Sequence, residues 1–190
     1  IQNKKFPKRT RHYSKVSIVG LGIEGHVPDA LKTKCWMYFP EHDAPFFRAT
    51  VFSNYSKYNA PKGTWSLMTE TASSKFRPLP KGDIVNAVIK GAKKTKLIAK
   101  DAKIVSTWLF QTDHGYPTPT LARDAYLLKI LPKLEKLSIF SRGRFGAWKY
   151  EVSNQDHTFM HGVEWVDSMV QDTKELTLHN PHIVNRSTSG

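Results

Sequence analysis

Cysteine is almost absent from the chain, which contains a single one, Cys35, among its 190 residues. A lone cysteine can form neither a disulfide nor a cysteine zinc site within the chain, and this favours a reducing compartment. Cys35 lies between Lys34 and Trp36, where we expect a small buried hydrophobic side chain rather than a nucleophile.

Long hydrophobic runs are also absent. No apolar stretch reaches membrane-spanning length, and the first fifteen residues, IQNKKFPKRTRHYSK, lack the apolar segment of a secretory signal. We therefore expect a soluble, cytoplasmic protein without a membrane partner. The start at Ile1 rather than at a methionine is compatible with an excerpt of a longer chain.

Acidic residues are scarce, 16 against 29 lysines and arginines, so the net charge is +13. Such an excess suits an anionic partner, which could be nucleic acid, a phosphorylated metabolite or an acidic protein surface. Nucleic acid is the least favoured of these, because aromatic side chains are not interleaved with the lysines as a stacking platform requires. Two groups of six basic residues lie in residues 1–15 and 90–103, and we interpret both runs first as solvated faces or tails.

The spacing of apolar residues predicts both strands and helices. Alternation of β-branched and aromatic side chains predicts strands over residues 15–19, 35–39, 46–55, 65–71, 104–110 and 138–150. Helices are predicted to begin at Asp83, at Thr118, from which one runs to Pro132, and at Asp156. Strands first, then helices mixed with strands, indicate an α+β fold with a mainly antiparallel sheet.

Each predicted helix has an apolar stripe that we expect to be buried. In the first helix the stripe comprises Ile84, Val85, Val88 and Ile89. In the two later helices the stripes comprise Leu121, Ala125 and Leu128, and then Phe159, Val163, Val166 and Val170.

Residues 20–25, GLGIEG, match the dinucleotide-binding pattern G-x-G-x-x-G after a strand. Such a site needs a helix immediately afterwards, because the pyrophosphate lies at the N-terminus of that helix. The following residues, HVPDALKTK, include Pro28 and carry no long amphipathic stripe. We therefore interpret the motif as a glycine-rich turn between strands.

Arg144 lies between Gly143 and Gly146. Glycines at this spacing let a backbone approach a ligand closely, and the planar guanidinium suits phosphate oxygens. A turn with a surface arginine explains the pattern equally well. Asn154 and Gln155 come just before the last predicted helix, whose positive N-terminal end favours an anion.

Aromatic residues surround a second arginine in the predicted sheet. Arg48 lies on the same strand face as Phe52, which is unusual unless the arginine faces a ligand or a carboxylate. Trp36, Tyr38 and Tyr55 are nearby in the sequence. These aromatics suit a nucleotide ligand, although at such positions they more often belong to the core or its rim.

Three histidines were considered as catalytic or metal-binding residues. His114 follows Asp113 in the turn that also contains Tyr116, but two adjacent residues are weak grounds for an acid/base pair. His157 and His161 have the helical spacing of metal ligands. No glutamate or cysteine completes a ligand set, so no metal is expected.

Four long motifs remain, which are KCWMYFPEHDAPFFRATVFSNYS, TDHGYPTPTLARD, ILPKLEKLSIFSRGRFGAWKYEVSNQDHTFMHGVE and LTLHNPHIVN. They resemble the C-terminal part of eukaryotic UDP-galactopyranose mutases, which are flavoenzymes of the amine-oxidase-like FAD superfamily. The resemblance is weakest in residues 1–15 and 75–103.

The resemblance implies a mixed fold with two parts. A mainly antiparallel substrate-domain sheet with helices would be followed by the C-terminal strand and helix of a FAD-binding domain, whose N-terminal Rossmann part is absent. The implied segments are a basic tail (1–15), a substrate-binding sheet (16–75), its helix-strand-helix continuation (76–135), the return to the FAD-binding domain (136–180) and a loose tail (181–190).

The resemblance also implies an activity. Members of that family are isomerases of glycan biosynthesis that interconvert UDP-galactopyranose and UDP-galactofuranose through a flavin N5–sugar adduct. They use reduced FAD, with NADPH as the reductant. We expect the 190-residue piece alone to be inactive and not to retain FAD, so that the missing N-terminal half, or a partner chain supplying it, is required.

The resemblance assigns roles to particular residues. Arg48 and Arg144 would hold the UDP pyrophosphate and stabilise UDP as a leaving group, as catalytic residues. The other substrate-binding residues would be Trp36, Tyr38, Tyr55, Tyr116, Tyr150 and Asn154. The flavin-facing segment, residues 141–159, would contact the cofactor through Gly143, Asn154, Gln155 and Thr158.

Two positions depart from the family pattern, with Ser153 in place of a glycine and Trp165 in place of a small alanine. Together with the missing cofactor half, they motivate an alternative. In that alternative the chain is a catalytically inactive mutase-like domain that serves as a structural subunit of a larger assembly.

Overall fold

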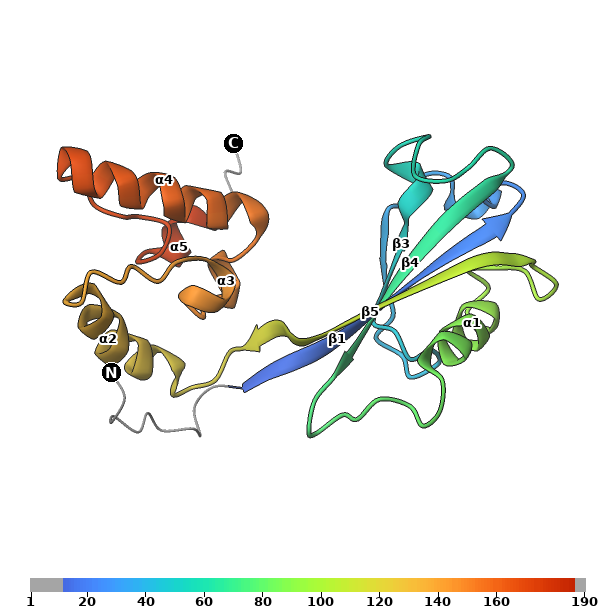
Figure 1. The fold of residues 1–190 in the computed structure, drawn as a ribbon, viewed down its shortest axis with the longest axis horizontal. Coiled ribbons are helices and arrows are strands. Elements are labelled where there is room, and N and C mark those ends of the chain that lie inside the picture. Colours follow the sequence, from blue (N-terminus) through green and yellow to red (C-terminus); the bar gives the residue numbers. More distant parts are fainter. Residues whose placement is uncertain (1–11, 187–190) are drawn as a thin grey trace. The chain divides into compact units, whose positions relative to one another are not determined.

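The computed structural model describes residues 12–186, and most of the predicted basic tail lies outside them. The described chain forms two compact units (Figure 1). The sheet unit comprises residues 14–115, and the helical unit comprises residues 116–186 together with residues 12 and 13. No helix among the described residues is both long and apolar enough to cross a membrane.

The sheet has five strands in the order β2-β3-β4-β1-β5. Its strands are β1 (His12–Glu24), β2 (Trp36–Tyr38), β3 (Arg48–Val51), β4 (Thr64–Ser73) and β5 (Ile104–Thr118). The pairings of β1 with β4, β3 with β4 and β2 with β3 are antiparallel. The predicted α+β class with a mainly antiparallel sheet is therefore confirmed.

One face of the sheet forms the core of this unit. Val19, Leu21 and Ile23 of β1 are buried against α1 (Ile84–Lys94), which covers this face of the sheet (Figure 1). Val88 of α1 is fully buried, as its predicted stripe requires. The predicted start of the helix is also confirmed, because the Asp83 side chain accepts a hydrogen bond from the Val85 N–H at 2.9 Å.

The prediction for Cys35 was wrong, because its side chain is exposed. The residue precedes β2, a strand of only three residues at the edge of the sheet. An edge position leaves one side of the strand without a neighbour, so alternation in a short aromatic stretch does not ensure burial.

Gly20 and Gly22 lie inside β1 rather than in a turn, which corrects the interpretation of GLGIEG. No α-helix follows; the next element is the three-residue 3₁₀ helix η1 (Asp29–Leu31). The dinucleotide interpretation therefore lacks its required helix, as the sequence indicated. Packing explains Gly22 instead, because a Cβ at this position would collide with Ser106 Oγ of β5.

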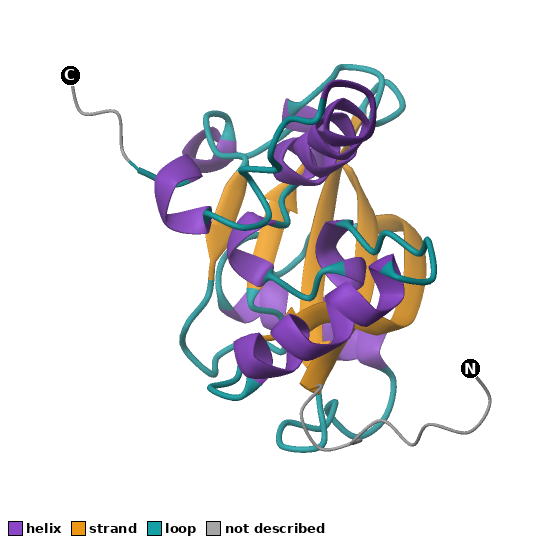
Figure 2. Cartoon of the chain, turned by 90° about the vertical axis from the view of Figure 1, so that its left-hand side faces the viewer, coloured by secondary structure: helices purple, strands orange, loops and turns teal. Residues whose placement is uncertain are grey.

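The helical unit contains α2 (Arg123–Glu135), α3 (Gly143–Gly146), α4 (Gln155–Gln171) and α5 (Pro181–Val184), with the 3₁₀ helix η3 at Tyr150–Val152 (Figure 2). A further 3₁₀ helix, η2 (Phe52–Asn54), follows β3 in the sheet unit.

Two helices of the helical unit, α2 and α4, bury different side chains from those predicted.

The first of them is α2, which exists as predicted but begins later, runs through Pro132 and buries a different face. Its buried residues are Arg123, Leu127 and Leu131, whereas Leu121 and Leu128 of the predicted stripe are exposed. Arg123 forms two hydrogen bonds with the Glu151 carboxylate, at 2.7 and 2.6 Å. This tertiary ion pair fixes which face of the helix turns inward.

The second is α4, whose N-cap is Asn154 and not Asp156. Its predicted stripe is largely exposed, with Phe159 at 71% and Val170 at 75% of their full accessibility. The residue that α4 does bury is His161. An apolar stripe predicts which residues a helix can bury, but what lies beside the helix decides whether it does.

The strand predicted over residues 138–150 is absent, and α3 and η3 occupy this stretch. Ser138, Gly143 and Trp148 have φ angles of 56°, 79° and 56°. Backbone in this left-handed region cannot continue an extended strand. In place of the FAD-domain strand that the resemblance implied, this stretch therefore forms the short helix α3 and the 3₁₀ helix η3.

Candidate functional site

Arg144 of α3 packs on two tyrosines of the helical unit. Its guanidinium carbon lies 4.9 Å from the centre of the Tyr116 ring and 5.8 Å from that of Tyr150. The two rings meet edge to face, with centroids 6.0 Å apart. The structure thus brings together three of the residues to which the sequence assigned diphosphate binding. A cation held against aromatic faces is attracted by them but not neutralised.

The remaining bonds of Arg144 leave much of its guanidinium available. Its Nε donates to the Ser153 backbone carbonyl at 3.1 Å. Among the residues that the structure describes, neither terminal nitrogen of this guanidinium has a hydrogen-bond partner and no carboxylate forms a salt bridge with it. Two donors of one planar fork are therefore available to an anion.

The other arginines that support this unit are different. Arg123 pairs with Asp124 and Glu151, and Arg142 pairs with Glu135 and Glu175. Each is a structural cation whose charge is balanced twice. Arg144, two residues beyond Arg142, is not balanced by any carboxylate between residues 12 and 186, which distinguishes it as the candidate ligand-binding arginine.

The backbone before Arg144 is held by Gly143, whose φ is +79°. Its N–H donates to Nδ1 of His161 at 3.2 Å. A Cβ at this position would lie 3.2 Å from Cγ2 of Thr158. A glycine is therefore required here both by the backbone angle and by the approach of α4.

The N-terminus of α4 presents the residues predicted to face a flavin. Asn154, Gln155 and Thr158 are exposed. The Asn154 side chain makes no capping hydrogen bond, and the carboxylate of Asp156 lies in the first turn, where it partly balances the positive end of the helix dipole. Ser153, by contrast, is buried and donates from Oγ to the Tyr150 carbonyl at 2.9 Å. The hydroxyl is thus used within the loop.

Arg48 in the sheet unit has a carboxylate partner. Its Nε and one terminal nitrogen donate to Oε1 of Glu70, at 2.8 and 2.5 Å. The two residues lie opposite each other on β3 and β4, and their side chains are 19% and 7% exposed. Of the two options that the sequence left open for Arg48, a ligand or a carboxylate, the carboxylate is present.

Aromatic side chains extend this second cluster on the same open face of the sheet. The Arg48 guanidinium carbon lies 4.9 Å from the centre of the Trp36 ring, and Tyr38 is opposite Arg48 in the register. Tyr55 follows η2, with its ring edge to face with Phe52 at 5.9 Å. Desolvation raises the pKa of Tyr55 above its usual value, so this phenol remains a hydrogen-bond donor at neutral pH.

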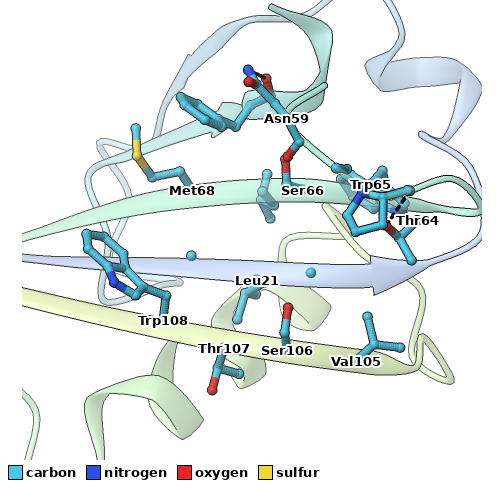
Figure 3. Close-up of a pocket in the computed structure, with 16 residues that line it drawn as sticks. Leu21, Asn59, Thr64, Trp65, Ser66, Met68, Val105, Ser106, Thr107 and Trp108 are labelled. Atoms are coloured by element: carbon cyan, nitrogen blue, oxygen red, sulfur yellow. Dashed lines mark hydrogen bonds between the residues drawn. The ribbon is translucent and has the colours of Figure 1, made fainter. Parts of the chain in front are cut away.

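A pocket of about 650 Å³ lies further along the same sheet face (Figure 3). Gly20 and Gly22 are among its lining residues, and Met68 and Trp108 lie at the same end of it. Gly20 is opposite Met68 in the register, and Met68 is opposite Thr50 of β3, so the pocket and the Arg48 cluster share one surface. None of its described lining residues is charged, which suits apolar or aromatic contacts rather than phosphate.

Sequence reasoning did not identify Glu70 or His161. Glu70 lies in a strand that was predicted from its alternating pattern. The only local sign of a special role is that an acidic residue stands between two threonines within a strand. Its partner is 22 residues away, so the strand register was needed to find it. His161 was considered only as a metal ligand, whereas it accepts a backbone hydrogen bond from Gly143.

Comparison with known proteins supports the resemblance seen in the sequence. No family model matches the chain. A crystal structure of reduced UDP-galactopyranose mutase is 47% identical, with a TM-score of 0.89, and the match covers 93% of this chain. A protoporphyrinogen oxidase-type structure from Exiguobacterium sp. 255-15 is 10% identical with a TM-score of 0.51, over 69% of this chain and 30% of that one, and it indicates a shared fold alone.

The match covers most of this chain but only part of the solved mutase. The chain spans 37% of the length of the solved mutase. The chain therefore corresponds, in sequence and in fold, to a C-terminal part of UDP-galactopyranose mutase.

Proposed function

We propose that this chain supplies the diphosphate-binding side of a UDP-galactopyranose mutase, an isomerase that interconverts UDP-galactopyranose and UDP-galactofuranose. The observation that carries the proposal is the Arg144 cluster. An arginine that pairs with no carboxylate in the described part of the chain and is held on Tyr116 and Tyr150 is suited to bind the diphosphate of a UDP-sugar.

The chemistry asked of Arg144 is electrostatic. When the bond between the sugar and UDP breaks, negative charge grows on the departing diphosphate. A guanidinium already fixed in place stabilises that charge without having to reorganise. The hydroxyl groups of Tyr116 and Tyr150 would add hydrogen bonds to the same diphosphate, and neither needs to lose a proton.

The Arg48 cluster would contribute differently. Glu70 balances much of the charge of Arg48 and fixes the direction of its fork, so Arg48 would bind a diphosphate through an oriented side chain rather than as an isolated charge. Trp36, Tyr38 and Tyr55 are about half exposed or more. They are therefore accessible as walls of the substrate-binding cleft.

The residues at the start of α4 fit the edge of a flavin. Asn154, Gln155 and Thr158 are accessible, whereas Gly143 is buried and its N–H is bonded to His161, so the contacts offered to a flavin are those of α4. FAD in its reduced form, with NADPH as the reductant, would supply the nucleophile for the sugar. Most FAD contacts would come from the part of the mutase that this chain does not span, or from a partner chain that supplies it, so we expect this chain alone neither to retain FAD nor to be active.

Binding of UDP to the 190-residue chain tests the proposal. Isothermal titration calorimetry should detect UDP binding, and Arg144→Ala should weaken it by at least about tenfold, the loss of a charge-assisted hydrogen bond. Arg77→Ala, which removes an exposed arginine of the sheet unit, is the matched control and should leave the affinity unchanged. Equal affinities for all three proteins would exclude Arg144 as the diphosphate ligand.

A second experiment addresses the activity. The chain mixed with, or fused to, the remaining two thirds of a mutase should become yellow with FAD and convert UDP-galactopyranose after reduction. Arg48→Ala and Arg144→Ala should each abolish conversion while the flavin absorbance remains. A mixture that stayed colourless in saturating FAD would contradict the enzyme proposal.

The exposed side of α4 favours a second candidate, a catalytically inactive mutase-like domain that serves as a structural subunit. Phe159, Val166, Met169 and Val170 form an accessible apolar set on this helix, which is typical of a surface that contacts another protein. Copurification of the native chain in a fixed ratio with other subunits, together with unchanged function of an Arg48→Ala/Arg144→Ala variant, would support this candidate over the enzyme.

A further inference from the structure

His161 is the buried residue of α4, and its environment is unusual. Nδ1 accepts the N–H of Gly143 at 3.2 Å. Nε2 is also buried but has no hydrogen-bond partner among the described residues. A leucine or valine would satisfy the packing of a helix at lower cost, because a buried polar atom without a partner is unfavourable. The hydrogen bond to Gly143 is what a histidine adds here.

The bond fixes the protonation state of the ring. A nitrogen that accepts a hydrogen bond carries no proton, so the neutral ring must hold its proton on Nε2. Protonation would place a second N–H on Nδ1, directly facing the N–H of Gly143. The charged ring is therefore incompatible with the observed contact.

We infer that neutral His161 is a positioning residue for the diphosphate site, because it holds Gly143 in the left-handed turn from which Arg144 reaches Tyr116 and Tyr150. The inference rests on the proposed function of Arg144. Gly143 directly precedes Arg144, and α3 begins at this glycine. The guanidinium has its own anchor at Ser153, so the backbone bond and the side-chain bond together define its position.

The charged groups around His161 come from α4, from the segment before α3 and from the segment after α4. They are Glu164, Arg142, Glu175 and His157. Burial is the largest influence and lowers the pKa of His161, Arg142 and His157 act in the same direction, and the two glutamates oppose them. Glu164 and Glu175 are themselves engaged, by Thr177 and by Arg142, so burial prevails.

The sign of the pH dependence follows. The unfolded chain takes up a proton on this histidine near pH 6.5, whereas the folded chain resists it. The stability contributed by neutral His161 is complete above that pH and is lost as the pH falls below it. In the folded chain the bond to Gly143 is broken only when the ring takes up a proton, and the lowered pKa of His161 delays this to a pH below the ordinary histidine value. The affinity for a diphosphate should therefore decline as the pH falls through that lower, folded-state pKa.

Two substitutions separate positioning from packing. In His161→Asn, the amide oxygen can take the place of Nδ1 and accept the Gly143 N–H, but the side chain does not titrate. In His161→Leu, a side chain fills the space but accepts nothing. UDP-galactose is the test ligand, because its diphosphate is esterified on both sides and keeps its charge between pH 5 and 8.

Three results are expected for the 190-residue chain. At pH 7.5, His161→Leu should weaken UDP-galactose binding about tenfold, because the hydrogen bond that positions Gly143 is lost. It should also speed hydrogen exchange of the Gly143 amide by a similar factor. His161→Asn should restore both. The affinity of the unmodified chain should stay constant down to about pH 6.5 and fall as the pH is lowered further through the lowered, folded-state pKa of His161, whereas that of His161→Asn should not fall.

Amide exchange keeps the inference separate from the proposed function. If the unmodified chain binds no UDP-galactose, the proposed function fails, yet protection of the Gly143 amide and of the Arg144 Nε–H in the three proteins still decides the positioning role. If His161→Leu unfolds by circular dichroism, the comparison of His161→Asn with the unmodified chain across pH remains. Unchanged Gly143 protection in folded His161→Leu, or the same pH dependence in His161→Asn, would overturn the inference.

Discussion

The two units of this protein treat an arginine in opposite ways. In the sheet unit, Arg48 lies across the strands from Glu70 and shares its charge with that carboxylate. In the helical unit, Arg144 lies on two tyrosine rings, and no described carboxylate pairs with it. Both were assigned the same role by resemblance, but only one carries an unbalanced charge.

The difference has a physical origin. Glu70 is nearly inaccessible, with 7% of its side chain exposed, so its carboxylate requires a cation and Arg48 provides it. Arg144 belongs to the four-residue helix α3 and is only half-buried, so water can hydrate its charge. Arg48 is therefore part of the fold as well as of the site, and Arg144 is more nearly dedicated to a ligand.

The largest expected effect comes from breaking the pair in the sheet unit. Glu70→Leu should lower the free energy of unfolding by about 3 kcal/mol, because it removes the carboxylate that balances the largely buried charge of Arg48. Urea unfolding followed by far-UV circular dichroism measures this. The double variant Arg48→Met/Glu70→Leu should recover most of the loss, since replacing a buried pair with apolar side chains is often neutral. A double variant no more stable than the single one would contradict this account.

The next effect compares two glycines with positive φ, one in each unit. Gly143→Ala should destabilise the protein by about 2 kcal/mol, because the left-handed backbone disfavours a Cβ and because Thr158 is only 3.2 Å from that position. Gly25→Ala, at φ +98° with no atom within 4 Å of the new Cβ, should cost about 1 kcal/mol from the backbone alone. Equal losses in thermal or urea unfolding would show that Thr158 moves aside freely.

The third comparison concerns the helix N-termini. Asp83→Ala should cost about 1 kcal/mol, because Asp83 caps α1. Asn154→Ala should cost a few tenths of a kcal/mol at most, because Asn154 makes no capping bond. A large loss in urea unfolding for Asn154→Ala would mean that this side chain has a structural role instead of one in ligand binding.

The smallest effect on stability should come from Arg144 itself. Arg144→Gln removes a cation that is stacked on Tyr116, a contact worth about 0.5 kcal/mol where water reaches it, whereas the amide nitrogen of the glutamine can still donate to the Ser153 carbonyl that Nε of Arg144 binds. The measured free energy of unfolding should therefore change by no more than this, even though UDP binding is lost. A loss comparable to that of Glu70→Leu would remove the contrast between the two arginines.

The fold was predictable where local pattern and capping agree. The helix after Asp83 combines a stripe, a capping residue and a preceding loop, and it appears as predicted. The stretch 138–150 has apolar alternation but depends on left-handed residues at Ser138 and Trp148, which no local pattern requires. Its strand prediction therefore failed.

The candidate site was predictable in part. The grouping of Arg144 with Tyr116 and Tyr150 followed from the resemblance, and the structure brings these three side chains together. The partner of Arg48 did not follow, because residues 48 and 70 meet only through the pairing of β3 with β4. Their binding roles stay predictions.

The sequence by itself determined the family to which the chain is related, the α+β class and the absence of a dinucleotide-binding helix after GLGIEG. Each of these depends on contiguous motifs or on periodicity within one element. Only the tertiary structure decided which faces of α2 and α4 are buried, which carboxylate balances Arg48, and that His161 supports Gly143. These depend on groups far apart in the chain, whose burial and charge must be satisfied together when the elements pack.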